Sequence, residues 1–173
     1  KSCGIDRSEL QLVANRLQPE IERMQSVSHY DSDYAFVNVP FDDAALQTIS
    51  ALIEQKKALQ PKVIVVVGIG GSNLGTQAVQ EALLGKLYNL QQPEAEIYYA
   101  DTVDSDYIYD IILRVEQALE RQEVVLVNII SKSGTTTETV ANSELFLTIL
   151  NNAYGDVYKN YVVVTTDKNS ALW

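Results

Sequence analysis

Hydrophobic residues in the first third of the chain recur at the spacing of amphipathic helices, three and four positions apart. Asp6 is a suitable N-cap for the first of two predicted helices, and Pro19 predicts a kink or a break within it. The second helix is predicted over residues 43–59. The apolar faces consist of Leu10, Val13, Leu17, Ile21 and Met24 in the first helix, and of Leu46, Ile49, Leu52 and Ile53, facing inward, in the second. Residues 1–60 are therefore expected to form an amino-terminal helical segment.

From residue 61 onward, short apolar runs alternate with helical patterns. Val63 to Val67 is a continuous β-branched run, as expected for a parallel strand covered on both faces. Further strands are predicted at residues 97–100, 124–130 and 161–165, and helices at residues 76–87, 104–120 and 138–151. This alternation predicts an α/β domain over residues 61–173, with a parallel sheet of about four strands and flanking helices.

Two loops that follow predicted strands carry unusual chemistry. In parallel α/β sheets, ligands bind beyond the carboxyl ends of the strands. The first loop, residues 68–75, is rich in glycine, and the second, residues 131–139, places many hydroxyl groups around Lys132. Those hydroxyl groups belong to Ser131, Ser133, Thr135, Thr136 and Thr137. Each loop leads into a helix, whose first N–H groups attract anions, and the density of donors suits a phosphate group.

Other interpretations of the two loops give different functions. Glycine and hydroxyl residues also build tight turns and helix caps that bind nothing. The dinucleotide fingerprint G-x-G-x-x-G begins at Gly68 and Gly70 but meets Asn73 at its third glycine. Asp101, at the end of the second predicted strand, could imitate the acidic residue that binds a ribose, so a nucleotide site remains an alternative. A P-loop is excluded because Thr76 stands where that motif has lysine.

Composition narrows the possible partners. The formal charge of -10 argues against nucleic-acid binding, which needs a basic face. The single cysteine, Cys3, offers no disulfide and no zinc site, so we expect a cytoplasmic protein without a metal. The longest apolar run, Val63 to Val67, is far shorter than the ~20 residues of a membrane span, so no membrane partner is expected.

The two loops together resemble the glucose-6-phosphate isomerase family. Residues 66–75, VVGIGGSNLG, and residues 131–139, SKSGTTTET, are similar to motifs of its amino-terminal sugar isomerase domain, a flavodoxin-like three-layer sandwich. The resemblance covers about residues 35–168, and residues 164–168 match a further family segment. It implies interconversion of glucose 6-phosphate and fructose 6-phosphate by proton transfer through an enediol. It also implies a hexose 6-phosphate ligand, no cofactor, and a homodimer for the full-length protein.

The resemblance also implies roles for particular residues. Gly71 and Ser72 match sugar-phosphate contacts of the family. The phosphate-binding loop is matched by Ser131, Lys132, Ser133 and Thr136, with Gly134 and Thr135 completing the turn. The family's catalytic glutamate, histidine, lysine and arginine lie downstream, so no catalytic residue is assigned within residues 1–173. His29, the only histidine, is expected to be a surface or capping residue, and Glu138 a first-turn helix carboxylate.

We therefore expect a truncated amino-terminal part of an isomerase, whose sheet ends at its fourth strand and which is inactive by itself. The alternative is a non-catalytic regulatory module that binds sugar phosphates. An appended helix-turn-helix would favour that alternative, but residues 6–28 are acidic and lack a basic recognition helix.

Overall fold

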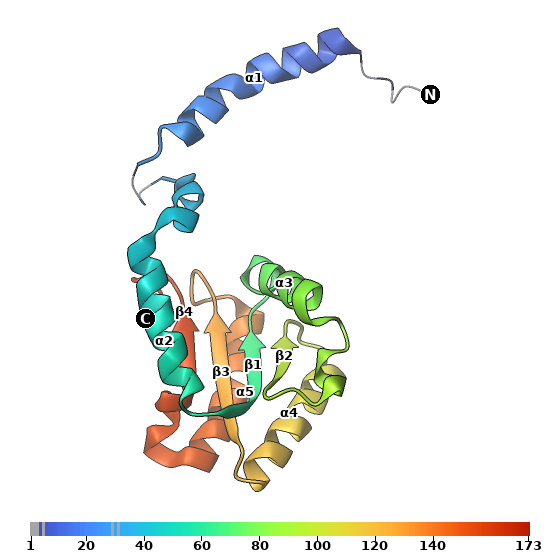
Figure 1. Cartoon of the computed structure of the whole chain (residues 1–173), viewed down its shortest axis with the longest axis vertical. Coiled ribbons are helices and arrows are strands. Elements are labelled where there is room, and N and C mark those ends of the chain that lie inside the picture. Colours follow the sequence, from blue (N-terminus) through green and yellow to red (C-terminus); the bar gives the residue numbers. More distant parts are fainter. Residues whose placement is uncertain (1–3, 5, 29, 31) are drawn as a thin grey trace. The chain divides into compact units, whose positions relative to one another are not determined.

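The computed structural model describes residue 4, residues 6–28, residue 30 and residues 32–173. Cys3 and His29, about which the sequence raised expectations, lie outside the described residues. Proximity of Cα atoms divides the chain into two units, Lys1–Ile53 and Glu54–Trp173. Figure 1 shows the elements of both units. Each unit is described separately below.

The first unit contains helix α1, Arg7–Gln25, which starts at the predicted N-cap. The Asp6 carboxylate accepts hydrogen bonds from the backbone N–H groups of Ser8 and Glu9, and the Glu9 carboxylate accepts one from the Asp6 N–H at 3.0 Å. This capping box confirms Asp6 as the N-cap. Of the kink or break predicted at Pro19, the break is wrong, because α1 continues through this residue. Proline has no N–H, so one carbonyl of the preceding turn lacks its helical hydrogen bond. Because α1 is exposed along its length, water can bind that carbonyl instead.

A 3-10 helix, Ala35–Phe41, follows, and then helix α2, Asp43–Lys57. The second predicted helix is thus present, but its apolar side chains do not face inward. They remain 37% to 52% exposed, in Leu46, Ile49, Leu52 and Ile53. The period of the pattern identified the helix correctly, whereas burial depends on a partner surface that the period does not specify.

The second unit contains a sheet of four parallel strands in the order β2-β1-β3-β4. The strands are β1, Pro61–Val67; β2, Glu96–Ala100; β3, Val124–Ile130; and β4, Val162–Thr165. The predicted α/β class and the parallel sheet of four strands are confirmed. The chain leaves β1 toward one side for β2 and returns to the other side for β3, so the order of strands reverses between β1 and β3. This reversal marks the usual ligand position in such sheets.

Helices α4, Ser105–Glu120, and α5, Thr137–Tyr154, cover one face of this sheet (Figure 1). Alternate residues of β1 and β3 point into the resulting core, because successive side chains of a strand point to opposite faces. The core is formed by Val63, Val65, Val67, Val125, Val127 and Ile129 from these strands, with Ile111, Val115, Phe146 and Leu150 from the helices. This packing holds the carboxyl ends of β1 and β3 side by side.

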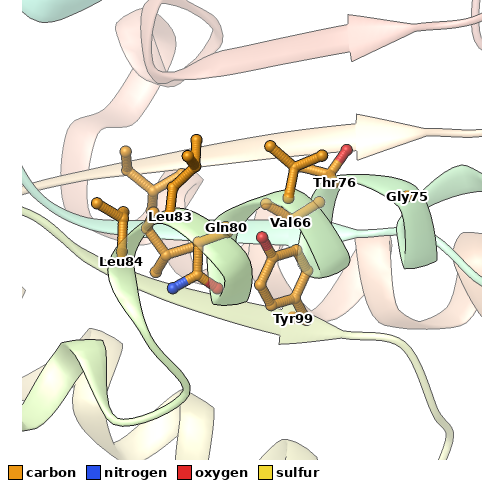
Figure 2. Close-up of a pocket in the computed structure, with 10 residues that line it drawn as sticks. Val66, Gly75, Thr76, Gln80, Leu83, Leu84 and Tyr99 are labelled. Carbon is orange, nitrogen blue, oxygen red and sulfur yellow. The ribbon is translucent and has the colours of Figure 1, made fainter.

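Helix α3, Leu74–Leu84, lies on the opposite face of the sheet. A pocket of about 600 Å³ lies between them, lined by apolar residues of β1, β2 and α3 (Figure 2). Val79 and Leu83 of α3, which line this pocket, are 59% and 77% exposed. The two faces of the sheet therefore differ, with a closed core under α4 and α5 and an open apolar layer under α3.

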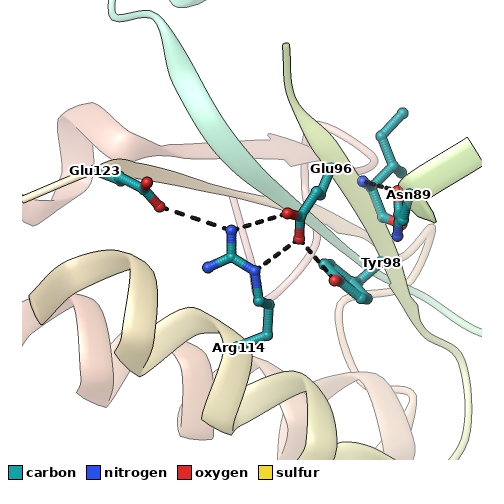
Figure 3. Close-up of polar contacts among 6 residues, drawn as sticks. Asn89, Glu96, Tyr98, Arg114 and Glu123 are labelled. Carbon is teal, nitrogen blue, oxygen red and sulfur yellow. Dashed lines mark hydrogen bonds and ion pairs between the residues drawn. The ribbon is translucent and has the colours of Figure 1, made fainter. Parts of the chain in front are cut away.

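A polar cluster joins β2, α4 and the start of β3 at the amino end of the sheet (Figure 3). Arg114 donates two hydrogen bonds to the Glu96 carboxylate, at 2.7 and 3.0 Å, and approaches Glu123 at 3.7 Å. Tyr98 donates to the same carboxylate at 2.7 Å. Burial, together with this hydrogen bond, raises the pKa of Tyr98 to about 12. The Asn89 side chain donates a hydrogen bond to the carbonyl of Ile97 and accepts one from its N–H. It therefore covers part of the free edge of β2.

Candidate anion-binding site

The two loops singled out in the sequence leave the sheet at the carboxyl ends of β1 and β3, which are adjacent strands. A Cβ on Gly68 would lie 3.0 Å from the carbonyl oxygen of Ile130, so the first loop begins directly beside the last residue of β3. Both loops therefore start at the point where the order of strands reverses. This is the position that parallel α/β sheets use for ligands.

The glycine-rich loop turns through a short 3-10 segment, Gly70–Ser72, before α3 begins. Asn73 is fully buried, and its side-chain amide donates a hydrogen bond of 2.8 Å to the carbonyl of Gly68. This bond ties the two ends of the turn together. Gly71 is exposed, and no heavy atom lies within 4 Å of where its Cβ would be. A ligand can therefore approach the backbone of Gly71 closely, with the partly buried Ser72 beside it.

The hydroxyl-rich loop, residues 131–136, is organised by hydrogen bonds among its own residues. Buried Ser131 accepts a hydrogen bond from the N–H of Gly134 at 3.1 Å, and its hydroxyl lies 3.4 Å from that of Thr136. Ser133 accepts hydrogen bonds from the N–H and the hydroxyl of Thr135, at 3.2 and 3.0 Å. A hydroxyl that accepts a hydrogen bond keeps its own proton to donate. The loop is thus preformed and still offers donors.

Positive charge reaches this loop from two sources. The Lys132 side chain is exposed, and no carboxylate of the described residues lies within the 4.0 Å of an ion pair with it. Thr136 is the N-cap residue of α5, but its side chain makes no capping hydrogen bond. The first N–H groups of α5 therefore remain available at the positive end of the helix. A lysine and a helix terminus at one loop favour an anion over a neutral ligand.

The structure places all eight candidate residues on these two loops. Gly71 and Ser72 lie on the first, and Ser131, Lys132, Ser133, Gly134, Thr135 and Thr136 on the second. Sequence reasoning missed two contributors. Asn73 was considered only as a failed third glycine, although a small amide next to glycines often hydrogen-bonds local backbone. The segment after β4 also contacts the second loop, through Thr166 and Asp167.

Two other kinds of site are not supported in the part of the chain that the structure describes. There, no three His, Cys, Asp or Glu side chains are grouped so as to hold a metal ion. The pocket under α3 is lined mainly by apolar side chains and includes no residue of the hydroxyl-rich loop (Figure 2). This pocket therefore does not suit a phosphate, which needs polar donors.

None of the helices among the described residues has the length and apolarity to cross a membrane.

Comparison with known proteins finds similar sequences among glucose-6-phosphate isomerases. The glucose-6-phosphate isomerase of Fusobacterium nucleatum is 34% identical, over 95% of this chain and 37% of that protein. The enzyme of Exiguobacterium sibiricum is 38% identical, over 79% of this chain and 31% of that protein. The chain thus spans about a third of the length of these relatives.

Solved structures share the fold. A hypothetical protein from Thermus thermophilus superposes with a TM-score of 0.66 and 28% identity, covering 94% of this chain and 37% of that one. A glucose-6-phosphate isomerase from Chlamydia trachomatis gives a TM-score of 0.64 over 97% of this chain and 36% of that one, and its 22% identity supports the fold alone. The profile of the phosphoglucose isomerase family matches residues 52–172, which include both loops and all four strands. The chain therefore belongs to the phosphoglucose isomerase family.

Proposed function

We propose that these 173 residues are the amino-terminal part of a glucose-6-phosphate isomerase and that their two loops bind the phosphate of a hexose 6-phosphate. The observation that carries the proposal is the position of both loops at the β1/β3 reversal in a member of this family. Lys132, the hydroxyl groups around it and the start of α5 supply charge and donors suited to a phosphate dianion.

In the proposed reaction, the parent protein interconverts glucose 6-phosphate and fructose 6-phosphate by proton transfer through an enediol. The phosphate is remote from the carbons that react, so its binding energy serves to hold those carbons in position. Residues 1–173 supply this anchor, and the groups that move protons belong to the rest of the parent. Glu138 stays outside the proposed chemistry, because it lies in the first turn of α5. The full-length parent is proposed to be a cytoplasmic homodimer.

A calorimetric titration of the 173-residue chain with three ligands tests the phosphate anchor. Glucose 6-phosphate is expected to bind, whereas glucose and NAD at equal concentration are expected to give no saturable heat. The difference follows because the charged donors of the site find no partner in an uncharged sugar. Equal binding of glucose and glucose 6-phosphate would contradict the phosphate anchor, and tighter binding of NAD would favour the nucleotide alternative. Isomerase assays of the intact parent test the reaction itself.

A further inference from the structure

The segment that follows β4, residues 166–172, packs against the hydroxyl-rich loop, and we call it the post-β4 turn. The carbonyl of Lys132 accepts two hydrogen bonds from it: one from the backbone N–H of Asp167 at 3.2 Å, and one from the hydroxyl of Thr166 at 3.4 Å. The turn is itself closed by a hydrogen bond of 3.0 Å from the N–H of Ser170 to the carbonyl of Asp167. The Thr166 and Ser170 hydroxyls are also bonded to each other.

At Gly134, the post-β4 turn leaves no room for a side chain on the hydroxyl-rich loop. A Cβ at this position would lie 2.8 Å from the backbone nitrogen of Leu172 and 3.0 Å from that of Ala171. Neither atom belongs to a flexible side chain that could move aside. The φ of Gly134 is also +70°, which is strained for any residue with a side chain. This glycine therefore lets two backbone segments touch.

The contact with Lys132 determines which way one peptide group of the loop points. In a trans peptide, the carbonyl of one residue and the N–H of the next point in opposite directions. Because the post-β4 turn binds the Lys132 carbonyl, the N–H of Ser133 is directed away from that turn. Among the described residues, none accepts a hydrogen bond from this N–H. It is therefore a free donor at the anion-binding loop.

We propose that the post-β4 turn is a positioning element of the phosphate site, acting through the Lys132 carbonyl and the backbone of Gly134. It binds no ligand; it holds the hydroxyl-rich loop so that the Ser133 N–H and the start of α5 face the phosphate together. This inference rests on the proposed function and adds three positioning residues to it: Gly134, Thr166 and Ser170. Without the contact, the loop would have to become ordered on binding, which weakens affinity.

The test compares Gly134→Ala with Gly155→Ala in the 173-residue chain. Gly155, the residue after α5, also has a positive φ, +59°, and has no heavy atom within 4 Å of its Cβ position, so its substitution adds backbone strain without a clash. Gly134→Ala is expected to weaken glucose 6-phosphate binding at least tenfold. Gly155→Ala is expected to change it less than twofold, although it also lowers thermal stability. The amide NMR signal of Ser133 should shift in free Gly134→Ala and stay in place in Gly155→Ala.

A second pair keeps the inference testable if Gly134→Ala fails to fold. Thr166→Val removes the hydroxyl at nearly constant shape, and with it the hydrogen bonds to the Lys132 carbonyl and to the Ser170 hydroxyl. Binding should weaken about three- to tenfold, because a neutral hydrogen bond that positions the loop is lost. Thr166→Ser keeps the hydroxyl and should bind within twofold of the unsubstituted chain. Unchanged affinity in Gly134→Ala or in Thr166→Val would overturn the positioning role while leaving the phosphate anchor in place. Failure of the unsubstituted chain to bind glucose 6-phosphate would overturn both.

Discussion

Some residues of the hydroxyl-rich loop stabilise its turn, and others offer donors to a ligand. Ser131 is buried, and its oxygen accepts the Gly134 N–H, so its first role is to close the turn. Lys132 is exposed and adds the only full positive charge among residues 131–139. In a loop where every other donor is neutral, that charge is expected to dominate the attraction of a phosphate, because charge-assisted hydrogen bonds are the stronger kind.

Lys132→Ala is therefore expected to weaken glucose 6-phosphate binding about tenfold to a hundredfold, the equivalent of roughly 1.5 to 3 kcal/mol for a hydrogen bond to a charged group. Calorimetric titration at constant ionic strength measures the change. Lys62→Ala is the matched control, since this exposed lysine lies near the amino end of β1, whereas the two loops leave the sheet at the carboxyl ends of its strands. If Lys132→Ala bound as tightly as the control, the backbone N–H and hydroxyl groups would account for the affinity without the lysine charge.

The elements were largely predictable from the sequence, and their exceptions have physical causes. A continuous β-branched run, Val63 to Val67, predicted β1 within two residues of its observed bounds, because a covered parallel strand is rich in such side chains. A mainly apolar run likewise predicted β3 at residues 124–130. The backbone conformation of three glutamines, Gln60, Gln92 and Gln122, was not predictable in the same way. Each adopts a positive φ of 53° to 59° shortly before a strand, a conformation normally taken by glycine. Nothing in the residue type signals this conformation, since glutamine has the same side-chain clash at positive φ as other residues with a Cβ.

The cluster around Glu96 shows how a side-chain contact joins three elements. Burial raises the pKa of Glu96, but the hydrogen bonds from Arg114 and Tyr98 and the guanidinium charge outweigh that effect, so its pKa lies below the ordinary value of 4.5. A carboxyl group with a lowered pKa in the folded state stabilises the fold above its unfolded pKa. This stabilisation is lost as the pH falls through the folded value.

Glu96→Gln is accordingly expected to lower the free energy of unfolding by about 1 to 3 kcal/mol at pH 7, as for loss of hydrogen bonds to charged groups. The difference from the unsubstituted chain should shrink as the pH falls below 4.5. Urea unfolding at pH values from about 3 to about 7 measures this difference in the free energy of unfolding, because that range brackets the reference pKa of the carboxyl group. Glu54→Gln is the control, because Glu54 pairs with Lys57 only at the surface and should show little change. A difference that did not vary with pH would show that the Glu96 charge does not contribute.

Across the whole chain, charge and length limit what these residues can do. A net charge of -10 opposes binding to polyanions, but screening over about 8 Å at physiological ionic strength leaves a local lysine site effective for a small phosphate. The chain also aligns with only 37% of the Fusobacterium nucleatum enzyme. Binding and turnover by this chain are therefore predicted separately.

The 173-residue chain is expected to bind glucose 6-phosphate yet convert none of it, because its loops supply donors and we assign no proton-transfer group to it. A coupled assay for fructose 6-phosphate formation, with the parent protein as the positive control, checks this expectation. Turnover by the chain at more than a small fraction of the parent rate would place the catalytic base within residues 1–173. Glu138 would then be the first carboxylate to substitute.

The local pattern of the sequence determined the secondary structure, the α/β class and the chemistry of the two loops. These depend on side-chain size, period and functional groups, which each residue carries with it. Tertiary structure decided which faces are covered. Val79, Leu83 and the apolar residues of α2 fit helical faces yet remain exposed, because burial requires a partner surface. Tertiary structure also decided that Gly134 contacts the post-β4 turn, since contacts between backbone segments far apart in sequence depend on how the sheet is assembled.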